Sequence, residues 1–337
     1  MKKLIVLFAF LAMYQVAAPA ENDLAKAREA YASFKTALTK AQELQNQGQT
    51  EVAEEQQRSA HEALEKARQL FDEARVSQSN DFDALMEYAD ALNWTGDSDL
   101  AREVLERALQ LKPDSQKAWL SLGKVFVDLG AAYLTNAQQA FLKALDLSKT
   151  QDEEVETRVT LVMFYWNAGL YAAAKEQSSI LKGKKPDSIP NIIIQAGLAT
   201  REGRFKDAET DLNTITQLSP QQGALLNKVL TQALDDFELS RGFIPDEAAT
   251  HAAYAKLLIR ANRVEESLLP IERAVKLAPD EYTYWNTLAS VCRFTNDIDR
   301  AREAYARSLE LYPDQPRIRD AMESLGKDNG QGISSLP

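Results

Sequence analysis

Histidine and cysteine, the side chains that most often act as general base, nucleophile or metal ligand, are nearly absent from this sequence. The 337 residues contain two histidines, His61 and His251, and one cysteine, Cys292. A catalytic nucleophile needs a base and an orienting group beside it, and no sequence pattern places such groups near these residues. We expect His251 to have a packing role, His61 to be exposed, and Cys292 to be a buried, unreactive thiol.

Acidic residues are abundant, but their spacing predicts no site. The runs Asp152–Glu154 and Asp235–Asp236 lack the ligand spacing of a metal site and are typical of solvated helix faces. The sequence also has no glycine-rich loop of the kind that cradles phosphate. We therefore predict a protein that is not an enzyme, with no catalytic residue, no cofactor and no bound metal.

The composition narrows the possible partners and the fold class. Asp and Glu (50) outnumber Lys and Arg (39), which gives a formal net charge of −11. This balance argues against nucleic acid as a partner, because phosphate backbones are bound by basic surfaces. Glycine (13) and proline (11) are scarce, and 45% of the residues are hydrophobic, so the composition favours helices throughout.

The first 20 residues have the features of an export signal. Two lysines precede an apolar run, and Ala18-Pro19-Ala20 has the form of an A-x-A cleavage site. The apolar run is shorter than a membrane-spanning helix requires, so we expect residues 1–20 to be a signal peptide that is cleaved after Ala20. The pattern resembles a bacterial export signal, which implies a periplasmic protein that meets the membrane only through a partner.

Prolines and glycines mark a regular interval along the rest of the chain. A spacing of 34 residues separates Pro186 from Pro220, Pro279 from Pro313, and Gly169 from Gly203. A fixed period of this length is typical of a solenoid, in which each repeat buries its apolar face only by stacking on its neighbours.

The residues between these markers follow a pattern as well. The segment at Trp119 reads W-x₂-L-G-x₂-F, and the segment at Trp285 reads W-x₂-L-A-x₂-C; an A-x₃-F or A-x₃-Y pattern follows each. These motifs resemble the tetratricopeptide repeat family. The resemblance implies an all-α, right-handed superhelical solenoid of antiparallel helix pairs, in which small residues such as Gly123 allow the two helices to approach.

The resemblance extends over residues 82–315. We predict four repeats over 82–221 and two over 247–315, with an inserted helix and loop over 222–246 that breaks the register between the two blocks. Residues 316–337 are expected to finish a helix and then form a disordered tail.

Residues 21–81 leave two helical interpretations open. The apolar residues in the first half follow the 3,4 spacing of a helical hairpin. However, Ala67 and Phe71 lie 34 residues before the matching positions of the next repeat, and a capping box at Ser59 would start a helix there. We favour a degenerate repeat preceded by one more helix over a long hairpin.

The resemblance also implies a partner-binding surface, because the first helices of such pairs line a concave face where partners usually dock. Carried over to this sequence, the predicted groove residues are Met86, Asp90, Trp94, Leu120, Lys124, Val159, Met163, Trp166, Ile193, Arg201, Lys256, Arg260, Arg293 and Phe294. Such a lining suits an amphipathic helix or an extended peptide. The alternative is that some of these residues belong to the core.

We therefore predict a non-catalytic scaffold or adaptor of the bacterial cell envelope. It would hold a peptide or helix of a partner protein in its groove during complex assembly, secretion or polymer export. Two alternatives remain, a periplasmic chaperone-like assembly factor and an accessory subunit of a cell-wall or exopolysaccharide enzyme complex. The sequence names neither the partner nor the oligomeric state.

Overall fold

The computed structural model describes the chain apart from residues 1–20, 219–222, 241 and 326–337. The predicted signal peptide and the predicted disordered tail therefore lie outside the described residues. Every regular element within the described residues is a helix, so the all-α prediction is confirmed. The chain divides into two compact units, residues 1–164 and 165–337.

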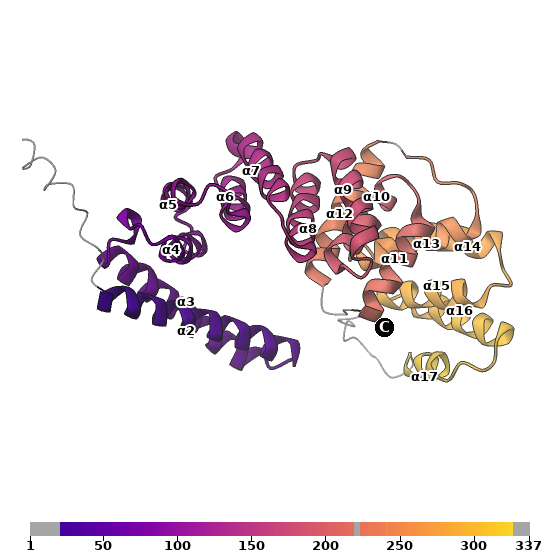
Figure 1. Ribbon diagram of the computed structural model, residues 1–337. Coiled ribbons are helices and arrows are strands. Elements are labelled where there is room, and N and C mark those ends of the chain that lie inside the picture. The colour runs from indigo at the N-terminus through magenta and orange to yellow at the C-terminus, as the bar shows by residue number, and fades with distance from the viewer. Residues whose placement is uncertain (1–20, 219–222, 241, 326–337) are drawn as a thin grey trace, which may run out of the picture. The chain divides into compact units, whose positions relative to one another are not determined.

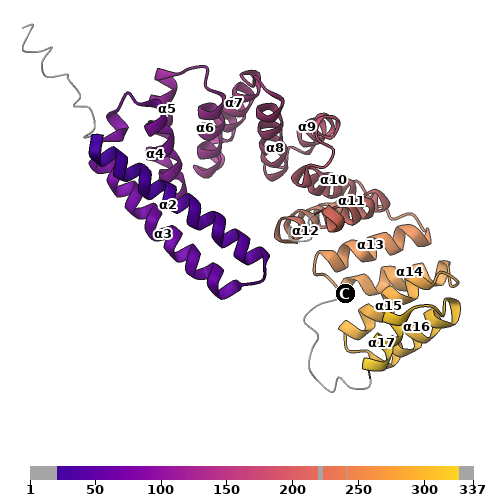
Figure 2. The same ribbon diagram turned by 60° about the horizontal axis from the view of Figure 1, so that its bottom comes forward.

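The N-terminal unit begins with a long helical hairpin, α2 (Glu21–Asn46) and α3 (Thr50–Glu73), whose helices lie side by side (Figures 1 and 2). Helix α3 continues without a break through Ser59, so our preference for a degenerate repeat is wrong for this segment. The reason is one uninterrupted apolar stripe, which keeps the helix buried on one side along its whole length: Ala53, Ala60, Leu64, Ala67 and Phe71.

Shorter helices follow the hairpin in antiparallel pairs. In the N-terminal unit they are α4 (Phe82–Trp94), α5 (Ser98–Leu111), α6 (Gln116–Asp128), α7 (Leu134–Asp146) and the first part of α8 (Gln151–Asn167). In the C-terminal unit they are α9 (Tyr171–Lys184), α10 (Ile189–Arg201), α11 (Phe205–Leu218), α12 (Gly223–Leu239), α13 (Ala248–Arg260), α14 (Leu268–Leu277), α15 (Tyr282–Phe294), α16 (Ile298–Leu311) and α17 (Pro316–Ser324). The prediction of stacked helix pairs is confirmed.

The pair α6 and α7 shows how the repeat motif produces this packing. Gly123 of α6 lies directly against the Phe141 ring of α7, and a Cβ atom at position 123 would overlap that ring. Phe141 is fully buried, with alanines around it on α7. The missing side chain therefore allows the two helix backbones to approach closely.

The turns inside the pairs adopt a left-handed backbone, which glycine and asparagine accommodate. Asn262 and Asn296 both have φ near 62°, and the glycines at the equivalent turns also have positive φ. The motif tryptophans act at the other end of the first helix. Trp119 donates its indole N–H to the carbonyl oxygen of Pro113 at 2.9 Å, and Trp285 donates to Pro279 at 2.8 Å.

The inserted helix α12 does not interrupt the stack. It packs on α10, while α11 packs directly on α13. The prediction that residues 222–246 break the register is therefore wrong, because α11 and α13 contact each other directly although α12 lies between them in the sequence. Pro270 lies in the first turn of α14, where its missing N–H leaves no helix hydrogen bond unmade. A 3₁₀ turn precedes this helix, which begins at Leu268.

Candidate partner-binding surface

The described residues include no cluster of side chains arranged for catalysis. No cluster of three or more His, Cys, Asp or Glu there could hold a metal ion. Cys292 is buried, and burial raises the pKa of its thiol, which makes it a poor nucleophile. His251 is largely buried on α13 beside Asp246. No helix in the described part of the chain is both long and apolar enough to cross a bilayer.

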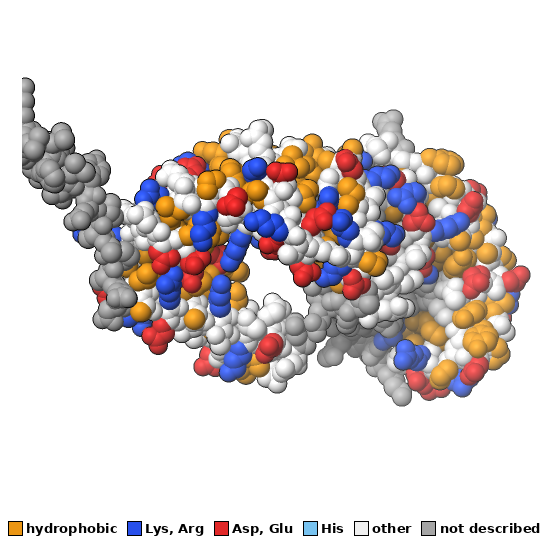
Figure 3. Space-filling model, in the orientation of Figure 1, with side chains coloured by type: hydrophobic (Ala, Val, Ile, Leu, Met, Phe, Trp, Pro, Cys, Tyr) orange, Lys and Arg blue, Asp and Glu red, His pale blue; other side chains and the backbone are white. Residues whose placement is uncertain are grey.

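Charges on the described surface are mixed rather than segregated. In the view of Figure 3, Lys and Arg side chains alternate with Asp and Glu over the described helices. Many of them form short-range pairs, such as Arg158 with Glu154 at 2.8 Å and Arg204 with Asp207 at 2.5 Å. This face offers no basic stripe of the kind that follows a phosphate backbone.

Four predicted groove residues cannot line an open surface, because they are buried. Trp166 and Ile193 have no exposed area, Leu120 is 2% exposed and Met86 is 8% exposed. These residues belong to the core, which was the alternative that the sequence left open. The sequence did not show that additional helices of the same chain cover part of the inner face.

In the N-terminal unit, α2 supplies that cover over α4. Arg28 of α2 pairs with Asp81 and Glu87, and the Tyr31 hydroxyl donates to Asp90. The Phe34 ring meets Trp94 edge-on, with 5.6 Å between centroids. Asp90 and Trp94, two predicted groove residues, therefore face a helix of their own chain, although Trp94 keeps 55% of its surface exposed.

In the C-terminal unit, α12 covers the inner face of α10. Val229 of α12 lies over Gly197, where a Cβ atom would be 2.5 Å from the valine methyl group. Arg201 of α10, another predicted groove residue, pairs with Asp236 of α12 at 3.2 Å. The Trp166 ring meets the same place, since it would lie 2.7 Å from a Cβ atom at position 197.

The remaining predicted groove residues keep some exposure. In the N-terminal unit, Lys124 is exposed on α6, and Val159 and Met163 are partly buried on α8. In the C-terminal unit, Lys256 pairs with Glu209 at 2.5 Å. The others lie in the last turns of α13 and α15, where Arg260 and Phe294 are exposed and Arg293 is partly buried.

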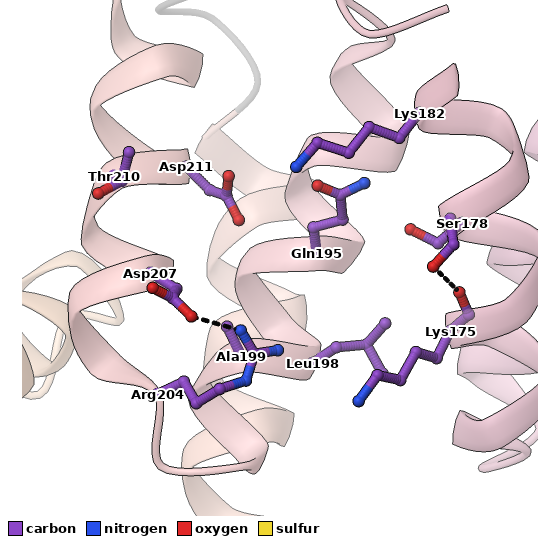
Figure 4. A pocket seen from close by; sticks show the side chains of 11 residues that line it. Lys175, Ser178, Lys182, Gln195, Leu198, Ala199, Arg204, Asp207, Thr210 and Asp211 are labelled. Carbon is purple, nitrogen blue, oxygen red and sulfur yellow. Dashed lines mark hydrogen bonds and ion pairs between the residues drawn. The ribbon is translucent and has the colours of Figure 1, made fainter. Parts of the chain in front are cut away.

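A polar pocket of about 360 Å³ lies between α9, α10 and α11 (Figure 4). Sequence reasoning missed it, because it forms where one helix pair meets the next. Lys175 at its rim is paired with Glu202 at 2.6 Å, and Arg204 with Asp207 at 2.5 Å. Burial raises the pKa of Asp211 on its wall. The pocket contains internal ion pairs rather than a nucleophile with an adjacent base, so we assign it no catalytic role.

Tyrosine–carboxylate hydrogen bonds attach the covering helices to the repeats. Tyr31 donates to Asp90, Tyr88 donates to Asp72, and the Tyr254 hydroxyl donates to Glu238 on α12 at 2.9 Å. Burial is the largest cause that raises the pKa of each of these three tyrosines, and the neighbouring carboxylate adds to it.

These shifts predict the alkaline behaviour of the protein. A phenol whose pKa is higher in the folded state than in the unfolded chain stabilises the fold below its ordinary pKa of about 10, and that stabilisation is lost as the pH rises further. In an ultraviolet titration we expect Tyr31, Tyr88 and Tyr254 to stay neutral when the exposed tyrosines ionise, and to ionise only as the protein unfolds. A single titration of all tyrosines near pH 10 would contradict these hydrogen bonds.

Comparisons with known sequences agree with the repeat pattern. Models of the tetratricopeptide repeat match residues 82–125 and 253–316. A mitochondrial pentatricopeptide repeat-containing protein of Arabidopsis thaliana is 25% identical in a 157-residue alignment, and the match covers 40% of this chain and 23% of that protein. The chain thus matches less than a quarter of the length of that relative.

Solved structures of repeat proteins also resemble this chain. A tetratricopeptide repeat protein from Parabacteroides merdae shares 12% identity, with 87% of this chain and 99% of that chain covered and a TM-score of 0.41. The C-terminal part of a TPR repeat-containing protein from Cytophaga hutchinsonii shares 14% identity over 77% and 94% of the two chains, with a TM-score of 0.44.

Proposed function

Because this chain is a tetratricopeptide-repeat protein, we propose that it is a non-catalytic scaffold or adaptor of the bacterial cell envelope that holds an acidic segment of one partner protein. Repeats that stack in this way create extended surfaces used for protein–protein interaction. The envelope location is proposed on the export-signal pattern of residues 1–20.

The observation that carries this proposal is an arginine that recurs in the last turn of the inner helices. Arg201 ends α10, Arg260 ends α13, and Arg293 lies in the last turn of α15. The first of these already binds a carboxylate, Asp236 of α12. The equivalent position on α13 is exposed, and no described carboxylate forms an ion pair with Arg260.

An apolar group accompanies these arginines. Phe294 follows Arg293 and is 39% exposed, and α13 and α15 belong to one hydrophobic cluster that fixes both helices. Cationic and aromatic side chains on a rigid support suit a partner segment that carries carboxylates next to an apolar residue. A helix or extended peptide of that kind is the partner we propose.

Photocrosslinking in intact cells tests this proposal. A photoreactive amino acid replaces Arg260 in the full chain, and the matched control carries it at Arg302, an exposed residue of α16. We expect one stoichiometric envelope partner to be crosslinked from position 260 and not from position 302. The double substitution Arg260→Glu and Arg293→Glu should lower its recovery about tenfold, because the added carboxylates repel an acidic segment.

The same experiment separates the alternatives. Many unrelated client proteins crosslinked from position 260 would favour a chaperone-like factor over a scaffold. Equal crosslinking from positions 260 and 302 would contradict the inner face as the binding surface. Recovery of the mature chain only from the cytoplasm would contradict the envelope location.

A further inference from the structure

The inner face of the C-terminal unit already holds a helix of its own chain. We propose that the inner face of α10 is a binding site for an amphipathic helix with carboxylates in its last turns, that α12 occupies this site in the free protein, and that a partner helix of the same chemistry competes with α12. This inference rests on the proposed scaffold function and specifies a second contact surface for it.

The site has an apolar floor shaped to receive a helix. Gly197 leaves room at its centre, since a Cβ atom there would lie 2.5 Å from Val229 and 2.7 Å from the Trp166 ring. The buried ridge of α12 extends over about three turns: Leu226, Val229, Leu230, Ala233, Leu234 and Phe237. The spacing of 3 and 4 residues along this ridge is that of an amphipathic helix laid in a groove.

The floor also carries donors for one carboxylate. The Tyr171 hydroxyl donates to Asp236 at 2.5 Å, and the Arg201 guanidinium donates to the same carboxylate at 3.2 Å. The guanidinium of Arg201 stacks on the Tyr171 ring at 4.0 Å, which fixes both donors in one orientation. Gln232, one turn earlier on α12, donates to the Tyr171 hydroxyl at 3.0 Å.

A second carboxylate binds at the end of the site. Glu238 accepts from the Tyr254 hydroxyl at 2.9 Å and pairs with Arg263 at 2.9 Å. Between the two acidic residues, Phe237 packs against Phe205, with 5.0 Å between ring centroids. The site therefore recognises a helix whose apolar ridge ends in an acidic residue, an aromatic residue and a second acidic residue. The charge-assisted hydrogen bonds to the two carboxylates are directional.

The stack does not depend on α12 for its continuity. Helix α11 packs directly on α13, so the floor of the site is formed by repeats that contact each other without the inserted helix. In this respect α12 resembles a bound ligand that is covalently attached. An attached helix competes at an effective concentration in the millimolar range, so an external helix binds measurably only when α12 is loosened.

The experiment uses a fluorescein-labelled synthetic peptide with the sequence of residues 223–239 as the probe, and fluorescence anisotropy as the measurement. It compares the full-length protein with the full-length variant Asp236→Lys/Glu238→Lys, in which two lysines face Arg201 and Arg263. The matched control is Asn227→Lys, an exposed position on the outer side of α12. We expect the double variant to bind the peptide at least about tenfold more tightly than the wild type and the control.

A second peptide tests the acid requirement. The peptide that carries both lysine substitutions should bind the double variant at least about tenfold more weakly than the native peptide does. If the double variant loses its far-UV helical signal, Asp236→Asn, which keeps the shape of the side chain, replaces it in the same comparison.

Two outcomes would overturn the proposal: a folded variant that does not bind the native peptide, or equal binding by the wild type and the variant. Neither outcome depends on crosslinking from Arg260. Failure to crosslink an envelope partner from position 260 would count against the scaffold function. The peptide-binding experiment alone decides the role of α12.

Discussion

Replacing Trp166 with alanine is expected to destabilise the C-terminal unit by about 3–5 kcal/mol, the range for removing a large aromatic side chain from a core. Trp166 has no exposed surface, lies against Gly197 and meets the Tyr171 ring at 5.1 Å between centroids. Its indole N–H has no hydrogen-bond partner among the described residues, so the loss comes from packing and from the cavity. Urea unfolding followed by far-UV circular dichroism measures it.

Trp94→Ala is the matched control for this substitution. Trp94 is 55% exposed and has one ring contact, the edge-on contact with Phe34, so we expect a loss of about 1 kcal/mol or less. Equal destabilisation by the two substitutions would contradict the burial of Trp166. Because Trp166→Ala acts on stability, only Trp94→Ala remains suitable for testing partner contact.

The second large effect is expected at Gly123. Gly123→Leu places a branched side chain where the Phe141 ring of α7 already lies. Phe141 is fully buried, so it cannot swing into solvent, and the two helices must separate. Overpacking of this kind costs about 1–3 kcal/mol and sometimes more, which should lower the urea midpoint of the N-terminal unit.

Gly183→Leu provides the same substitution without the clash. Gly183 lies in α9, and no atom comes within 4 Å of a Cβ atom built there. Leucine has a higher helix propensity than glycine, so we expect a gain of about 0.5 kcal/mol rather than a loss. A loss at position 183 as large as the loss at position 123 would show that the effect is not due to close packing of α6 on α7.

The elements with a periodic signal were predictable from the sequence. The motif around Trp119 and Gly123 placed the helix pairs and their turns, because small and large residues recur there at fixed intervals. The apolar stripe of residues 50–73 was also visible. The capping signal at Ser59 competes with this stripe in the sequence, but tertiary packing overrides such local signals.

Which positions of the inner face are covered by another helix was not predictable from the sequence. The repeat register predicts an inward position for Arg201, but whether such a position is open depends on which other helix lies over it. The carboxylate of Asp236 is 35 residues away from Arg201 in the sequence, and no periodic pattern links them. Repeat periodicity describes contacts between neighbouring units, whereas α2 and α12 lie outside the repeat.

The burial of Cys292 gives the protein a practical property. It is the only cysteine in the chain, it is fully enclosed in the last repeat, and its raised thiol pKa keeps it in the unreactive protonated form near neutral pH. A cysteine introduced at any exposed position is then the single thiol that a spin label, dye or crosslinker modifies in the folded state. The native chain can thus serve as its own cysteine-free background for distance measurements, without a substitution in its core.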